Sequence, residues 1–179
     1  MGVMMHMIKK YKLANYDSKL DIYQIQALRD FKTSIGLVKA GDLGGWVTGH
    51  SNLSHDGNCW IYNSSVLHKA RVCDNAVVAE KTFVLGNALV DGNAYVSDMC
   101  WLTEKAHVSG HASITDGVAI AENAYVAGNA VITGHAKIYG LVQVLDDAVI
   151  DGCVYIGGNI RLTGNDRING LKLEVNKKY

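Results

Sequence analysis

The chain has 179 residues with 17 basic and 17 acidic side chains, so its formal net charge is zero. A neutral chain provides no basic field for a long nucleic acid, and without a run of about 18 apolar residues we expect no membrane association. The four cysteines never form a Cys-x-x-Cys pair, and residues 1–10 lack an apolar segment of the length typical of a signal peptide. We therefore expect a reduced, cytoplasmic protein without bound metal.

The N-terminal unit, residues 1–45, is predicted to be a β-hairpin cap with a lead-in segment. Residues 11–28 alternate between polar and apolar side chains, as two strands would, and we place their turn at residues 16–19. A cap is needed because the first coil of a stacked fold would otherwise expose its apolar cross-section and an open strand edge.

The central unit, residues 46–170, is built on a period of six. Its aliphatic positions are Val72, Val78, Val84, Val90, Val96, Leu102, Val108, Ile114, Ile120, Val126, Ile132, Ile138, Val144, Ile150, Ile156, Leu162 and Ile168. A small residue stands four positions after most of them, and because it lies two before the next aliphatic residue, both point to the same side of a short strand. Two corner residues follow each strand. The first is Gly, Asp or Glu and the second is often Asn, and Gly and Asn tolerate the left-handed backbone of a sharp turn.

A fixed short period indicates a stacked solenoid, and three hexads close a triangular coil of 18 residues. Upstream, the aliphatic positions are spaced by 6, 8, 6 and 5 residues: Val47, Leu53, Ile61, Leu67 and Val72. This spacing predicts a bulge at residues 54–57 and a tightened corner near His68. Downstream, Asp166 takes an inward position, and residues 171–179 are predicted to be a C-terminal cap or tail.

The hexads of residues 72–168 resemble those of the hexapeptide-repeat, left-handed parallel β-helix superfamily. The resemblance implies an all-β fold: a single-stranded left-handed parallel β-helix in the form of a triangular prism, with the N-terminal β-hairpin as its cap. The left-handed sense rests on the resemblance alone, and right-handed triangular helices of the bactofilin type are the alternative. Residues 39–47 and 57–62 are similar to a segment of the YdcK-like β-helix proteins of bacteria and phages, whose transferase label rests largely on fold.

The unbroken period sorts the outward residues onto three faces, of which two are nearly uncharged and carry aromatic side chains. A monomer usually exposes less apolar surface than this. Hexapeptide-repeat proteins are typically parallel homotrimers, so the resemblance also implies self-association. We predict that the trimer contact is the face that carries Val77, Tyr95, Val131 and Val149.

The second nearly uncharged face, its corners and the neighbouring mixed polar face supply the candidate ligand residues. A small ligand held in clefts between protomers would meet Trp101, Lys105, His107, Tyr125, Lys137, Tyr139 and Tyr155. On the mixed polar face, His107 has Asp91 and Tyr125 as neighbours, with Arg71 and Arg161 farther along. This group is either a small anion site or a solvated polar ladder.

Catalysis would require a general base. Acyltransferases of the superfamily use a histidine between protomers, and the candidates for that role are His107, His111 and His135, with acyl-CoA bound along the prism edge. His111 and His135 hold corner positions that are elsewhere filled by Asn. No hexad between residues 72 and 168 carries an insertion that could clamp acyl-CoA, and the sequence contains no phosphate loop or metal-spaced cluster.

We therefore expect a non-catalytic homotrimeric binding module without a cofactor. The specific ligand hypothesis is a nucleotide signal of host defence, sequestered by a phage protein. The alternatives are a hexapeptide-repeat acyltransferase that uses acyl-CoA, and a structural or assembly spacer.

Overall fold

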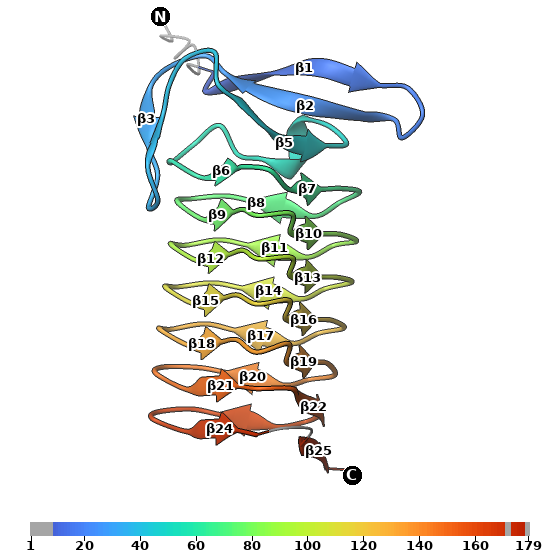
Figure 1. Cartoon of the computed structure of the whole chain (residues 1–179), viewed down its shortest axis with the longest axis vertical. Helices are drawn as coiled ribbons and strands as arrows, with labels where there is room; N and C mark the ends of the chain where they lie inside the picture. Colours follow the sequence, from blue (N-terminus) through green and yellow to red (C-terminus); the bar gives the residue numbers. More distant parts are fainter. Residues whose placement is uncertain (1–8, 171–172, 178–179) are drawn as a thin grey trace, which may run out of the picture.

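The computed structural model describes residues 9–170 and 173–177, which form a parallel β-solenoid (Figure 1). Residues 1–8 of the predicted N-terminal unit, and residues 171, 172, 178 and 179 of the predicted tail, lie outside the described residues. Paired residues in the regular coils are 18 positions apart, as in the pair of Phe83 with Trp101. The spacing differs by one position at the two ends, as in the pairs of Trp60 with Val77 and Val154 with Leu173. The all-β fold and the 18-residue coil are thus confirmed, and the left-handed sense stays a prediction.

Three sheets form the sides of the stack, and each is named by its number of strands. The six-stranded sheet contains β8 (Arg71–Val72), β11 (Leu89–Val90), β14 (His107–Val108), β17 (Tyr125–Val126), β20 (Gln143–Val144) and β23 (Arg161–Leu162). The seven-stranded sheet contains β6 (Trp60–Ile61), β9 (Val77–Val78), β12 (Tyr95–Val96), β15 (Ser113–Ile114), β18 (Val131–Ile132), β21 (Val149–Asp151) and β24 (Arg167–Asn169).

The ten-stranded sheet contains β1 (Tyr11–Asp17), β2 (Ile22–Ala27), β5 (Leu43–Val47), β7 (Ser65–Val66), β10 (Phe83–Val84), β13 (Trp101–Leu102), β16 (Ala119–Ile120), β19 (Lys137–Ile138), β22 (Val154–Gly158) and β25 (Leu173–Lys177). The remaining elements are the hairpin β3 (Phe31–Lys32) and β4 (Leu37–Val38) and the 3-10 helix η1 (His50–Asn52). Along the chain, the seven-, ten- and six-stranded sheets alternate in this order. Each coil therefore has three edges, and each edge lies opposite one sheet.

The interior contains the two inward residues of each hexad. Aliphatic residues such as Ile114 and Ile120, and small residues such as Ala112 and Ala124, have no exposed surface. Because each side chain stacks on its equivalents in neighbouring coils, the core is one continuous ladder rather than a globular centre.

The corners turn through a left-handed residue at their first position, whether or not that residue is glycine. The φ angle is 57° at Asp74, 65° at Gly92 and 59° at Glu104. No asparagine among the described residues has a positive φ, so our conformational reason for Asn at the second position is wrong. Its amide instead forms a ladder between coils, as where Asn75 Nδ2 donates to Asn93 Oδ1 at 3.2 Å.

The predicted N-terminal cap is present. Strands β1 and β2 form an antiparallel hairpin, and β2 pairs antiparallel with β5, so the hairpin extends the ten-stranded sheet beyond the first coil (Figure 1). The turn lies at residues 18–21, two positions later than predicted. The Asp17 carboxylate determines this position, because its Oδ1 accepts hydrogen bonds from the amides of Lys19 at 2.9 Å and Leu20 at 3.2 Å.

Of the two predicted irregularities, one is confirmed. Cys59 is the inward residue after Leu53 and follows it by six positions where four are usual, so residues 54–57 do form a bulge. The tightened corner near His68 is wrong, because Val66 rather than Leu67 is the fully buried residue. The chain shortens earlier, where the Ser64 amide donates to the carbonyl of Tyr62 at 2.6 Å.

At the C-terminal end, Asp166 does not point into a closed core. Asp166 is exposed, and its carboxylate accepts a hydrogen bond from the amide of Thr163 at 2.8 Å, which closes the corner. Strand β25 then pairs parallel with β22 and adds a last strand to the ten-stranded sheet.

The hairpin β3–β4 covers the upper part of the seven-stranded sheet. The Phe31 ring stands edge-on to Trp60 at 5.3 Å, and the hydroxyls of Thr33 and Tyr62 share a hydrogen bond of 2.8 Å. Val77 follows Trp60 in the ladder and is fully buried. Among the described residues, no helix has the length and apolar character needed to cross a membrane.

Candidate functional site

A surface groove of about 550 Å³ runs along the edge between the ten- and six-stranded sheets. Corner residues of successive coils line it: His68, Leu85, Gly86, Asn87, Thr103, Glu104, Lys105, Glu122 and Asn123. One of the predicted ligand residues, Lys105, is among them. Because the register is unbroken, the same edge positions of four successive coils line up to form its floor and walls.

The groove presents side chains rather than free main-chain groups. Corner amides already donate to the coil below, as Asn87 does to the Glu104 carbonyl at 2.6 Å and Lys105 to the Glu122 carbonyl at 2.9 Å. The lining contains two carboxylates, those of Glu104 and Glu122, together with Lys105 and His68. This mixture suits a polar ligand of low net charge better than a polyphosphate.

An exposed indole borders the groove. Trp101 lies two residues before the groove residue Thr103, so the two side chains project from the same face about 6.6 Å apart along the strand. The Trp101 ring stacks on Phe83 with centroids 4.6 Å apart, yet 46% of the residue remains exposed. An aromatic ring held in place on one side and open on the other can stack with a planar ligand.

The other predicted aromatic residues form a separate group lower on this face. Lys137 Nζ lies 5.1 Å from the centre of the Tyr155 ring. The Tyr139 ring rests against Gly157, where an added Cβ would come within 2.1 Å of it. Ala119 separates Trp101 from Lys137 in the ladder. The predicted ligand residues of this face thus belong to two places, not to one site.

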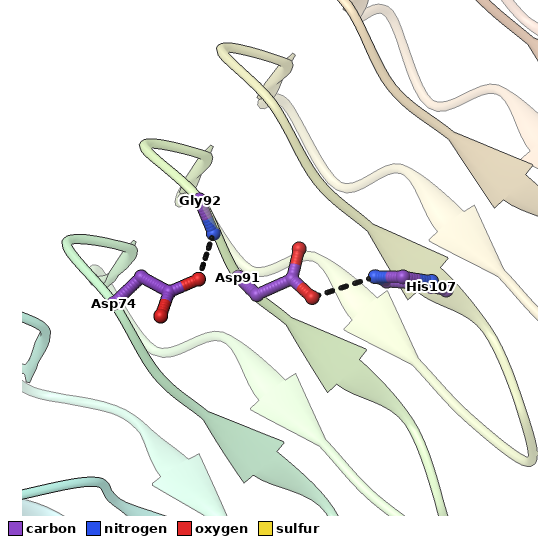
Figure 2. Close-up of polar contacts among 4 residues, drawn as sticks. All are labelled: Asp74, Asp91, Gly92 and His107. Atoms are coloured by element: carbon purple, nitrogen blue, oxygen red, sulfur yellow. Dashed lines mark hydrogen bonds and ion pairs between the residues drawn. The ribbon is translucent and has the colours of Figure 1, made fainter.

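The predicted neighbours of His107 are confirmed. His107 Nε2 lies 3.0 Å from Asp91 Oδ2 (Figure 2), and the Tyr125 ring packs at a centroid distance of 4.9 Å. The side chains of His107 and Asp91 are 33% and 20% exposed, so the pair is only partly screened by water. Arg71 and Arg161 belong to the two end strands of the six-stranded sheet and are not brought to this pair.

The three candidate histidines do not form one site. His107 projects from β14, whereas His111 lies at the corner between the six- and seven-stranded sheets. His135 is at the corner between the seven- and ten-stranded sheets and has φ 64°. The corner positions predicted for His111 and His135 are therefore confirmed. Among the described contacts of these three histidines, only that of His107 with Asp91 orients the ring by a carboxylate.

The predicted trimer residues lie in one column of the seven-stranded sheet. Val77 is fully buried by its own chain and offers no surface to a partner, whereas Val131 is 38% exposed. Because the groove lies on the edge opposite this sheet, a trimer joined here would leave the groove on its outside. The predicted contact and the groove are thus separate surfaces.

The structure contains two further features that were not predicted from the sequence. Lys10 is fully buried, and its Nζ donates to the Cys59 carbonyl at 2.9 Å and lies 3.2 Å from the Cys59 thiol. Burial lowers the pKa of Lys10 and raises the pKa of Cys59. The second feature is Asp74, whose Oδ2 accepts a hydrogen bond from the Gly92 amide at 3.0 Å beside Asp91 (Figure 2). Its position could have been found from the 18-residue register.

Comparisons with models of known protein families and with curated proteins gave no match. The function is therefore inferred from the repeat and from the geometry of the described residues.

Proposed function

We propose that this chain is a non-catalytic β-solenoid that binds a small polar ligand in the groove between the ten- and six-stranded sheets. The observation that carries the proposal is the groove itself, which combines about 550 Å³ of space with charges of both signs. Small-molecule sites are concave and contain a few polar groups beside apolar ones. Leu85 and Thr103 supply the less polar part of this lining.

The chemistry of the groove favours a nucleotide with few phosphates. A base would stack on the open face of Trp101, and the carboxylates of Glu104 and Glu122 would accept hydrogen bonds from ribose hydroxyls or base amino groups. Lys105 would pair with a single phosphate. A triphosphate would bring more negative charge than Lys105 and His68 can neutralise beside two glutamates.

The regular coils favour binding over turnover. Within the described residues 72–168, the inward aliphatic residue of each strand follows the previous one after six positions, so no loop extends from these coils to close over a substrate. Acyl transfer usually requires such closure to exclude water. The resemblance to the YdcK-like group of bacteria and phages fits a protein that sequesters a nucleotide signal.

We also propose a parallel homotrimer joined through the lower part of the seven-stranded sheet. Hairpin β3–β4 leaves this part uncovered, and its outward column includes Val131 and Val149. Such an assembly would leave one groove open on the outside of each protomer, so ligand affinity should not depend on the oligomeric state. This replaces our expectation of a ligand held between protomers.

A thermal-shift screen tests the ligand proposal. Adenine and cyclic nucleotides are added at increasing concentration, because a ligand that binds only the folded state raises the melting temperature. We expect a concentration-dependent rise that Lys105→Ala removes and that the matched control Lys81→Ala, at the edge between the seven- and ten-stranded sheets, retains. The absence of any shift with all nucleotides would contradict the proposal and favour the spacer function.

One observation supports acyl transfer as a second candidate. The carboxylate of Asp91 orients the His107 imidazole, as a carboxylate does for many general bases. If this pair is catalytic, acetyl-CoA is consumed in the presence of amine or hydroxyl acceptors, and His107→Asn abolishes the turnover. Equal rates for the wild type and His107→Asn would exclude His107 as the base.

A further inference from the structure

A cluster of a thiol and two carboxylates lies at the edge between the six- and seven-stranded sheets. Donor atoms of Cys73, Asp74 and Asp91 all lie within 4.8 Å of one another. Cys73 and Asp91 occupy the same outward position in successive coils, and Asp74 is the first corner residue after Cys73. The 18-residue register therefore brings one thiol and two carboxylates together from adjacent coils.

The chain contains its own comparison for this arrangement four coils below. Asp146 occupies the corner position equivalent to Asp74, and its Oδ2 accepts a hydrogen bond from the Gly164 amide at 3.0 Å, as Asp74 Oδ2 does from Gly92. The residue 17 positions after Asp146 is Thr163, whose hydroxyl donates to the same carboxylate. The lower corner thus pairs a carboxylate with a donor.

Asp116 at another edge repeats this pairing. The residue 17 positions later is Thr133, and its hydroxyl also donates to the Asp116 carboxylate. At Asp74 the residue 17 positions later is Asp91, and an ionised carboxylate has no proton to donate. The Asp74 carboxylate therefore faces a second negative group. At Asp116 and Asp146 the equivalent neighbour is a neutral threonine hydroxyl that donates a hydrogen bond. Like charges this close are unfavourable unless a proton or a cation lies between them.

Asp91 also has an unused oxygen. Its Oδ2 is bound by His107 at 3.0 Å (Figure 2). Its Oδ1 is shielded from solvent and has no hydrogen-bond partner among the described atoms. Buried polar atoms without a partner are rare and often mark the place of an ion or a water molecule. Asp91 Oδ1 lies near a second carboxylate and a thiol, and a cation bound among these groups would satisfy it.

We propose that Cys73, Asp74 and Asp91 bind a divalent transition metal of the zinc class. A thiolate with carboxylate oxygens suits Zn²⁺ or Co²⁺, whereas Mg²⁺ and Ca²⁺ prefer oxygen ligands only. Zinc bonds of roughly 2.0–2.3 Å place ligand atoms about 3.5 Å apart, so the donor atoms would need to approach one another by at most about 1.3 Å. His107 holds Asp91 from behind and fixes its orientation. The partly open corner leaves the fourth position to water.

Metal binding has to displace the thiol proton of Cys73. Burial, followed by the negative charges of Asp74 and Asp91, raises the pKa of Cys73 to about 11. Without a cation the thiol therefore keeps its proton at neutral pH. Binding of the metal would break the S–H bond, form the S–metal bond and release one proton to solvent. The site is independent of the groove, so either proposal can fail alone.

The test is titration of the chelator-treated full chain with Zn²⁺ and Co²⁺. We expect one equivalent of Zn²⁺ in calorimetry, and a Co²⁺ complex with the near-ultraviolet thiolate charge-transfer band. Cys73→Ser and Asp91→Thr should each weaken binding at least tenfold. Asp91→Thr recreates the residue type found at Thr163, so the corner should keep its fold, which circular dichroism checks.

The matched control is Cys153→Ser, since Cys153 is another half-buried cysteine that lies outside the site. We expect this variant to bind the metal like the wild type. His107→Gln should lower the affinity less than the loss of a ligand does. Equal affinity of the wild type and Asp91→Thr, or a Co²⁺ complex without the thiolate band, would overturn the proposal.

Discussion

Replacement of Ile120 by alanine tests whether the core is a rigid continuous ladder. Ile120 has no exposed surface and is paired in the ladder with Leu102 above and Ile138 below. The change removes three carbon atoms, which at about 0.8 kcal/mol each corresponds to about 2.4 kcal/mol of lost burial. A cavity term is added, because strands that are hydrogen-bonded to both neighbouring coils cannot move inward to fill the space.

We therefore expect Ile120→Ala to lower the free energy of unfolding by about 4 kcal/mol, near the upper part of the usual range. Ile168→Ala should cost only about 1 kcal/mol, because Ile168 is half-buried in the last complete coil. Ala119→Ser, an outward change on the same strand as Ile120, should change stability by less than about 0.5 kcal/mol.

The assay is urea unfolding followed by circular dichroism, with the midpoint and the slope compared between variants. An unchanged slope shows that the variant still unfolds as one unit. If Ile120→Ala and Ile168→Ala cost the same, or if Ile120→Ala costs less than 1 kcal/mol, the ladder can relax and the reasoning is refuted.

Three further predictions concern stability and assembly. Burial raises the pKa of the Cys100 thiol from 9.0 to about 12, so its stabilising contribution is complete below pH 9 and is lost between pH 9 and 12. Cys100→Ala should reduce the alkaline fall in unfolding free energy by up to about 1.4 kcal/mol per pH unit, and an unchanged pH profile would contradict this. Lys10→Met leaves the Cys59 carbonyl without its donor and should cost about 1–3 kcal/mol in thermal or urea unfolding; a more stable variant would show that burying the charge costs more than its hydrogen bonds contribute. In sedimentation velocity, Val131→Glu should convert the proposed trimer to monomer while Gln143→Glu on the six-stranded sheet should not, and a wild type that sediments as a monomer would contradict the trimer.

The coil could be predicted from the sequence because each of its rules is local and repeated. Each hexad repeats an inward aliphatic residue, an inward small residue and a turn residue. A wrong assignment in one hexad therefore does not carry over to the next. Upstream of Val72 the period is irregular, and the inward residue is harder to predict there. Val66 and Leu67 are adjacent and equally apolar, and only the tight bend at Ser64 determines that Val66 points inward.

The candidate site was only partly predictable, for a different physical reason. The column containing Trp101 follows from register, since residues separated by 18 stack. The contact of His107 with Asp91 also follows from it, because His107 pairs with Leu89 and Asp91 is the next outward residue after Leu89. The groove depends on side-chain shape at the edge, which register does not specify. Lys10 is buried beside an exposed Lys9, and nothing in the local pattern distinguishes the two, because the Cys59 carbonyl that binds Lys10 is 49 positions away.

The cluster of Cys73 with Asp74 and Asp91 joins residues of two adjacent coils. A search for metal ligands at short sequence spacing finds nothing around Cys73, because its partner Asp91 is a full coil away. In a solenoid, the relevant spacing is 18 residues, and Asp74 and Asp91 become neighbours only on that scale.

Isothermal titration of the groove tests the central functional claim most directly. The titrant is the nucleotide that gives the largest thermal shift, and the variants are Thr103→Trp, which fills the groove, and Gln143→Trp, which places the same bulk on the six-stranded face. We predict one saturable site per chain in the wild type and in Gln143→Trp, and no binding in Thr103→Trp. Saturable binding that survives in Thr103→Trp would contradict the assignment of the groove as the ligand site.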